Sequence, residues 1–82
     1  MLIKELAEKV EQLRKDLTAE EFQDFVNCFA ENVQDPVSDR RYRMFVDFKT
    51  KDPAQFNALS KGCKAAAELF MWVVEAENSL NK

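Results

Sequence analysis

Histidine is absent from the 82-residue chain, which removes the commonest general base and the commonest zinc ligand. Without it there is also no Cys–His or Ser–His pair for nucleophilic catalysis. The single glycine excludes a glycine-rich phosphate loop, and one glycine with two prolines disfavours the many tight turns of a small β-barrel. We therefore expect no enzyme, no metal site and no cofactor.

Cysteine is also scarce, with only Cys28 and Cys63 present. Two cysteines are too few for a disulfide framework or a metal site, and each lies in an apolar helical pattern where cysteine behaves as a small hydrophobe. We expect two separate, reduced, buried thiols, as is usual in a cytosolic protein.

Long apolar runs are missing as well. The longest, residues 69–74, is far shorter than the roughly 20 residues of a membrane span. Charged side chains interrupt the N-terminal segment where a secretory signal would need an apolar core. The sequence therefore predicts a cytoplasmic protein without membrane contact.

The residues that are present indicate one small globular domain over 1–82. Hydrophobic residues make up 46% of the chain and charged residues 33%, which is too apolar for a disordered chain. The net charge of −3 is unevenly distributed, at −5 over residues 1–35, +4 over 36–64 and −2 over 65–82. This segregation allows one segment to lie beside another of opposite sign.

Apolar residues recur at helical spacing in the first half of the chain. A stripe at every third or fourth residue predicts a helix over 2–15. Thr18 and Glu21 have the spacing of a capping box and predict a second helix over 19–34. The Asp35-Pro36 step then ends it, because proline disfavours helical geometry in the preceding residue.

Residues 38–51 fit two structures. Tyr42, Met44, Val46 and Phe48 alternate with mostly polar neighbours, as in a strand, yet the same segment also fits an amphipathic helix. A lone strand has no partner within this chain. We favour a helix; the alternative is an α+β fold in which 39–50 form a strand that pairs with a second copy.

The last segment carries the longest regular stripe and predicts one helix over 53–79. Asp52, Pro53 and Gln55 have the order expected at a helix start, with aspartate as the cap. Gly62 and the alanines that follow offer a smooth surface for close approach of another helix. The fold class predicted is all-α, a small bundle of about four helices with a longer C-terminal helix. The predicted core comprises Leu6, Val10, Leu13, Phe22, Phe25, Val26, Phe29, Met44, Phe48, Phe56, Leu59, Cys63, Phe70 and Val73.

The stretch 69–74 is apolar on every side of a helix, so it has to be covered on every side. Either shorter helices wrap it completely, or part of it forms a surface for another chain, because tryptophan and methionine are enriched in interface cores. The leading hypothesis is a non-enzymatic interaction module: a small cytosolic regulator or adaptor, expected to be a homodimer, that docks through an apolar helix face. The expected partner-binding residues are Leu69, Met71, Trp72 and Val74.

The alternative function is a nucleic-acid-binding regulator. The basic segment places arginines beside an aromatic ring, a combination that can hold phosphates while the ring stacks on a base. A chain of acidic pI argues against this, since nucleic-acid-binding domains are usually basic. The residues of this alternative site are Arg40, Arg41, Tyr42, Arg43, Lys49 and Lys51.

Overall fold

The computed structural model describes residues 2–33 and 38–80, which form five helices and no strand. The all-α prediction is confirmed, and the strand alternative for 39–50 is wrong because those residues lie in a helix. The longer C-terminal helix is also present. The helices are α1 (Leu2–Asp16), α2 (Ala19–Asn32), α3 (Ser38–Lys51), α4 (Pro53–Asn57) and α5 (Lys61–Leu80).

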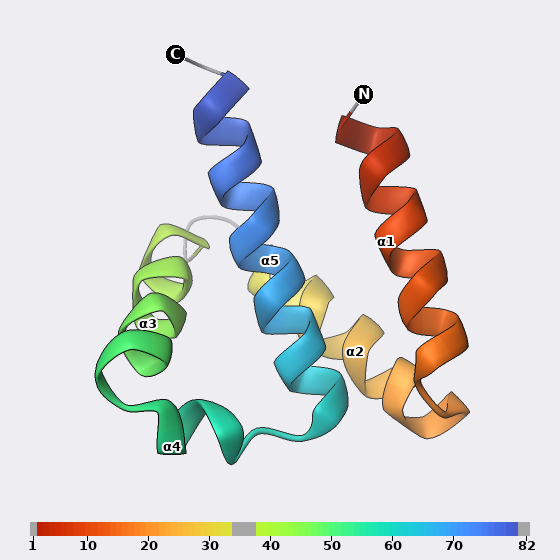
Figure 1. Cartoon of the computed structure of the whole chain (residues 1–82), viewed down its shortest axis with the longest axis horizontal. Helices are drawn as coiled ribbons and strands as arrows, with labels where there is room; N and C mark the ends of the chain where they lie inside the picture. The colour runs from red at the N-terminus through yellow and green to blue at the C-terminus, as the bar shows by residue number, and fades with distance from the viewer. Residues whose placement is uncertain (1, 34–37, 81–82) are drawn as a thin grey trace.

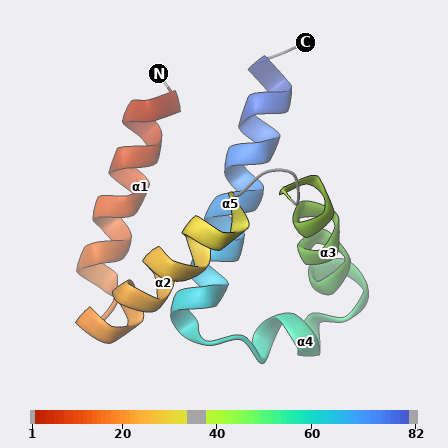
Figure 2. The same ribbon diagram turned by 180° about the vertical axis from the view of Figure 1, so that it is seen from behind.

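The central element is α5, and the other helices surround only part of it. In Figure 1, α1 and α3 stand on opposite sides of α5, and α4 lies below α3. Figure 2, seen from behind, shows α2 crossing α5 on its rear face. No other helix crosses the front of α5 between α1 and α3 in Figure 1. None of the described helices is long and apolar enough to cross a membrane.

The start of α2 follows the capping chemistry predicted from sequence. The Glu21 backbone N–H donates to Thr18 Oγ1 at 3.2 Å, and the Thr18 backbone N–H donates to Glu21 Oε1 at 2.9 Å. These two bonds satisfy donors that a helix start leaves unpaired. The helix ends at Asn32, with Val33 as its cap, and the Asp35-Pro36 step lies outside the described residues.

The single helix predicted over 53–79 is wrong, because the chain breaks at residues 58–60 into α4 and α5. Ser60 provides the new start: the Cys63 N–H donates to Ser60 Oγ at 3.2 Å and the Lys64 N–H to its carbonyl at 2.8 Å. At the start of α4, Asp52 makes no side-chain cap hydrogen bond, contrary to expectation. The break lets Phe56 turn inward, where it is buried against α3 and α5.

The core consists of two clusters on different sides of α5. One centres on Phe45, Phe56 and Phe70, with the rings of Phe45 and Phe70 edge to face at 6.2 Å. The other joins Leu17, Phe25, Ala66 and Leu69. Most of the predicted core side chains lie in or against these clusters. Four do not: Val26 and Met44 are 42% and 40% exposed, and Cys63 and Val73 are half-buried outside both clusters.

Helices α2 and α5 approach each other closely where they cross at Gly62. A Cβ placed on this residue would lie 2.8 Å from Asp24 Cβ and 2.9 Å from the Phe25 nitrogen, and closer still to the Glu21 carbonyl oxygen. These distances are too short for a real Cβ, so the crossing requires glycine. The expectation that the smooth segment receives another helix is confirmed.

The same crossing joins the two cysteines. Cys28 of α2 and Cys63 of α5 form a disulfide, with their Cα atoms 5.5 Å apart. The expectation of two separate reduced thiols is therefore wrong. The cysteines are 35 residues apart in sequence, and only the α2–α5 crossing brings them within the range of a disulfide.

Candidate interaction groove

The predicted partner-binding residues divide between the core and the surface. Leu69 and Met71 are buried, one in each core cluster. Trp72 and Val74 are only half-buried. The short helices thus cover the first half of the apolar stretch and leave its second half partly open, so the surface that remains available centres on Trp72.

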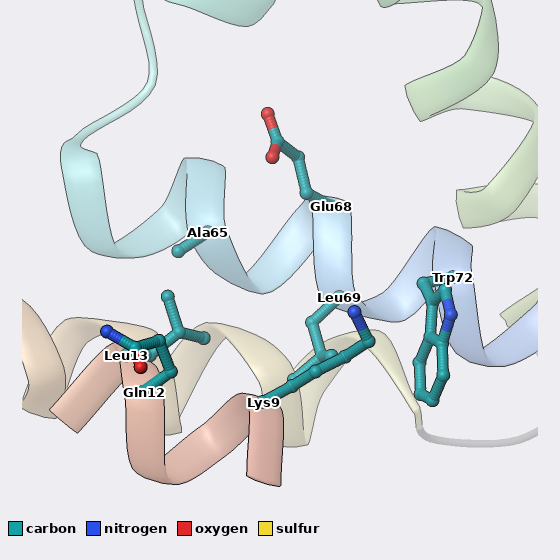
Figure 3. A pocket seen from close by; sticks show the side chains of 7 residues that line it. All are labelled: Lys9, Gln12, Leu13, Ala65, Glu68, Leu69 and Trp72. Atoms are coloured by element: carbon teal, nitrogen blue, oxygen red, sulfur yellow. The ribbon is translucent and has the colours of Figure 1, made fainter. Parts of the chain in front are cut away.

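A groove runs between α1 and α5 and ends at the Trp72 ring (Figure 3). Its volume is about 320 Å³. The figure shows Leu13 and Leu69 in its floor, while the Glu68 carboxylate points away from α1. We call this surface the Trp72 groove; it is lined by Lys9, Gln12, Leu13, Ala65, Glu68, Leu69 and Trp72.

The spacing of residues on each helix explains the lining. Ala65, Leu69 and Trp72 are separated by four and three residues, so they share the face of α5 that looks toward α1. Lys9 and Leu13 are four residues apart on α1 and share the facing stripe. Each helix therefore contributes one continuous wall.

Trp72 is held by a cation from the opposite wall. Lys9 Nζ lies 4.8 Å from the centroid of the Trp72 ring, within the range of a cation–π contact. Because Lys9 is exposed and Trp72 half-buried, this contact is a surface one and leaves part of the indole accessible. The ring is positioned but not enclosed.

Two further hollows adjoin the same tryptophan. One, of about 410 Å³, continues along α1 past Glu5 and Glu8. The other, of about 290 Å³, lies between α3 and α5 and includes Lys49 and Glu75. Trp72 lines all three hollows. The three hollows therefore meet at this one aromatic side chain, which lies between α1 and α3.

The α3 side of this surface is fixed by a hydrogen bond between helices. The Tyr42 hydroxyl donates to Glu75 Oε1 at 3.3 Å. Burial of the phenol, and to a lesser degree the neighbouring Glu75 carboxylate, raises the pKa of Tyr42 above its ordinary value. The protonated phenol thus ties α3 to α5 beside the hollow.

The molecule exposes more surface than its size requires. Its accessible surface is 5889 Å² for a mass of 9.5 kDa, whereas a typical folded monomer of this mass exposes about 5000 Å². The excess is similar to the roughly 800 Å² that each partner buries in a standard protein–protein interface.

Several side chains of the basic segment make contacts within the protein. Arg41 donates to the buried Asn32 Oδ1 at 3.1 Å, and Tyr42 is engaged by Glu75. Lys49 lies 5.7 Å from the centroid of a phenylalanine ring, and Lys51 pairs with Asp47 at 3.6 Å. Arg40 and Arg43 are exposed on α3. Of the predicted nucleic-acid site, Arg41 and Tyr42 are thus engaged by side chains of other helices, whereas Arg40 and Arg43 are exposed.

Sequence reasoning missed the polar edge that α1 supplies. Glu5, Glu8, Lys9 and Gln12 line the hollows beside Trp72, although their pattern indicated only the solvent side of an amphipathic helix. Their position next to the apolar stripe was the available signal. Nothing in the sequence indicated which helix that edge would face.

Among the described residues, no group of three or more acidic or cysteine side chains is arranged to hold a metal ion. Comparison of the chain with protein-family models, with curated proteins and with solved structures gives no match. The geometry of the front face is therefore the basis for a functional proposal.

Proposed function

We propose that this protein is a non-enzymatic interaction module, a small regulator or adaptor that docks a helical segment of another protein on the Trp72 groove. The observation that carries the proposal is the position of Trp72, half-buried and lining three adjoining hollows. Partly covered tryptophans at the centre of a concave surface are typical anchors of protein interfaces. The surface area in excess of a compact monomer supports the same conclusion.

The structure changes the role expected of the individual residues. Leu69 and Met71 support the surface from within, because both are buried in core clusters. Trp72 is the member of the predicted set that lines the hollows and is only half-buried. Val74 is also half-buried, but it lines none of the hollows and packs against the cluster of Phe45 and Phe70. A polar residue at Met71 would therefore report on folding, whereas a change at Trp72 reports on docking.

The test is affinity capture from native lysate with the wild-type protein and two matched variants. Trp72→Ala removes the ring, and Met44→Ala truncates an apolar side chain that is 40% exposed and lines none of the three hollows. We expect wild type and Met44→Ala to retain the same protein and Trp72→Ala to lose it. Circular dichroism checks that all three remain helical.

Other outcomes of this experiment would favour other functions. Retention that disappears on nuclease treatment and requires Arg40 and Arg43 would favour the nucleic-acid alternative. A dimer in light scattering that Trp72→Ala dissociates would make a second copy the occupant. If all variants retain the same protein equally, the Trp72 groove is not the docking site.

The cytoplasmic location expected from the sequence stays a prediction. Cytosolic reductants keep most protein thiols reduced, so the redox state of Cys28 and Cys63 in cells bears on it directly. Alkylation of free thiols immediately after lysis would measure that state.

A further inference from the structure

The charges around Trp72 define the chemistry of the partner, if the proposed docking function holds. Four exposed carboxylates surround the hollows, which we call the acidic rim: Glu5 and Glu8 on α1, and Glu68 and Glu75 on α5. They lie on both walls of the surface. A molecule seated on Trp72 would therefore have carboxylates on either side.

No carboxylate of the acidic rim forms an ion pair with a cation of the described residues. The ion pairs among the described residues join Arg14 to Glu11 and Lys51 to Asp47, and neither pair includes a carboxylate of the acidic rim. Glu75 accepts a hydrogen bond from the Tyr42 hydroxyl, a neutral donor that leaves its charge in place. The rim thus keeps its negative charge for interaction with a partner.

The two lysines that line the same surface are directed to aromatic rings. Lys9 Nζ lies over Trp72 at 4.8 Å, and Lys49 Nζ lies 5.7 Å from the centroid of Phe56. Four carboxylates against two lysines leave the surface with an excess of two negative charges. Opposite charge on the partner would steer association and fix its orientation.

The length of the surface indicates how much of a helix it can hold. On α1 the lining residues run from Glu5 to Leu13, which is about 12 Å at 1.5 Å per residue. This length matches roughly two turns of a partner helix. Such a helix would present apolar residues at positions i, i+3, i+4 and i+7 to the floor.

We infer that the occupant is an amphipathic helix of a different protein, with an apolar strip that packs on Trp72 and lysine or arginine residues along both edges that face the acidic rim. This inference rests on the proposed docking function. A second copy that presents the same face is disfavoured, because the two acidic rims would then lie against each other.

The first step of the test is selection from a displayed library of helices. Each helix is about 16 residues long, or roughly four turns, with leucine or phenylalanine on one strip and a random choice of lysine, glutamine or glutamate at every other position. Wild-type protein and Trp72→Ala are the two baits. We expect wild type to enrich lysine beside the apolar strip, and Trp72→Ala to retain nothing above background.

The second step measures the affinity of one enriched peptide by the fluorescence of Trp72, which is the only tryptophan of the chain. We expect Glu5→Gln combined with Glu8→Gln to weaken binding about three- to tenfold at low salt, since exposed charge pairs each contribute modestly. The loss should shrink at high salt. The matched control is Glu31→Gln combined with Glu77→Gln, which removes two exposed carboxylates that line none of the hollows and should leave affinity unchanged.

The outcomes separate this inference from the proposed function. Enrichment of glutamine or glutamate that still requires Trp72 would leave helix docking intact and overturn the basic partner. Equal weakening by the rim and control variants would overturn it too, because attraction would then follow net charge alone. A library without any retained member would overturn the inference, and the lysate capture would then decide the proposed function by itself.

Discussion

Reduction of the Cys28–Cys63 disulfide should strongly destabilise the protein. The bond closes a loop with a sequence separation of 35 residues that contains α3 and α4. For a loop of this length, the chain-entropy model gives a loss of about 4 kcal/mol in the free energy of unfolding at 25 °C. A domain of this size has a total stability of roughly 4 to 12 kcal/mol, so the loss is a third of the total or more.

The assay is thermal unfolding followed by far-ultraviolet circular dichroism, with and without a phosphine reductant. One kcal/mol corresponds to about 4 to 8 °C for a domain of this size, so we expect Tm to fall by about 15 to 30 °C. The control is the double variant Cys28→Ala with Cys63→Ala, whose Tm should not respond to the reductant. A thiol titration confirms that reduction is complete.

One result would refute the reasoning behind this magnitude. If both thiols titrate as free after reduction and Tm stays unchanged, the bond adds nothing to the stability of the α2–α5 crossing. The packing around Phe25 and Ala66 would then hold the two helices without a cross-link.

Three further predictions concern the same crossing and its surroundings. Gly62→Ala should lower the free energy of unfolding by about 1 to 3 kcal/mol in urea titrations, because the added methyl meets the Glu21 carbonyl and other backbone atoms that cannot rotate away; an increase in stability would contradict the close approach. Hydrogen bonding, chiefly from the Thr18 backbone N–H, lowers the pKa of Glu21 below its ordinary value of 4.5. The ionised Glu21 carboxylate therefore stabilises the fold above pH 4.5, and this stabilisation is lost as the pH falls further and the carboxylate is protonated. Glu21→Gln should therefore flatten the acid limb of Tm against pH. Asn32→Ala should lower the free energy of unfolding by about 1 to 3 kcal/mol in urea titrations, since the Arg41 guanidinium loses its hydrogen-bond acceptor. An unchanged unfolding midpoint would show that water replaces the Asn32 side chain as acceptor.

The elements of this fold were predictable where the determining signal is local. The start of α2 depends on Thr18 and Glu21, three residues apart, and the structure contains both of their hydrogen bonds. Such contacts form within one turn and need no help from the rest of the chain. The helical stripes likewise predicted the all-α class.

The break between α4 and α5 was not predictable from periodicity. The apolar stripe continues through residues 58–60 without a change of spacing, so the pattern favours one long helix. The structure instead places Phe56 in the cluster with Phe45 and Phe70. The Phe56 ring packs between α3 and α5 at this break. Ser60 caps the start of α5 and accepts hydrogen bonds from backbone N–H groups that the break leaves without a helical partner.

The sequence by itself determined that the chain is mainly helical and that Trp72 belongs to an apolar stretch needing cover. Only the tertiary structure decided how far that cover extends. Neighbouring helices bury Leu69 and Met71 and leave Trp72 open between α1 and α3. The same arrangement pairs Cys28 with Cys63. The physical reason is that helical periodicity fixes the faces of each helix, whereas the angles and separations between helices follow from packing of side chains far apart in the chain.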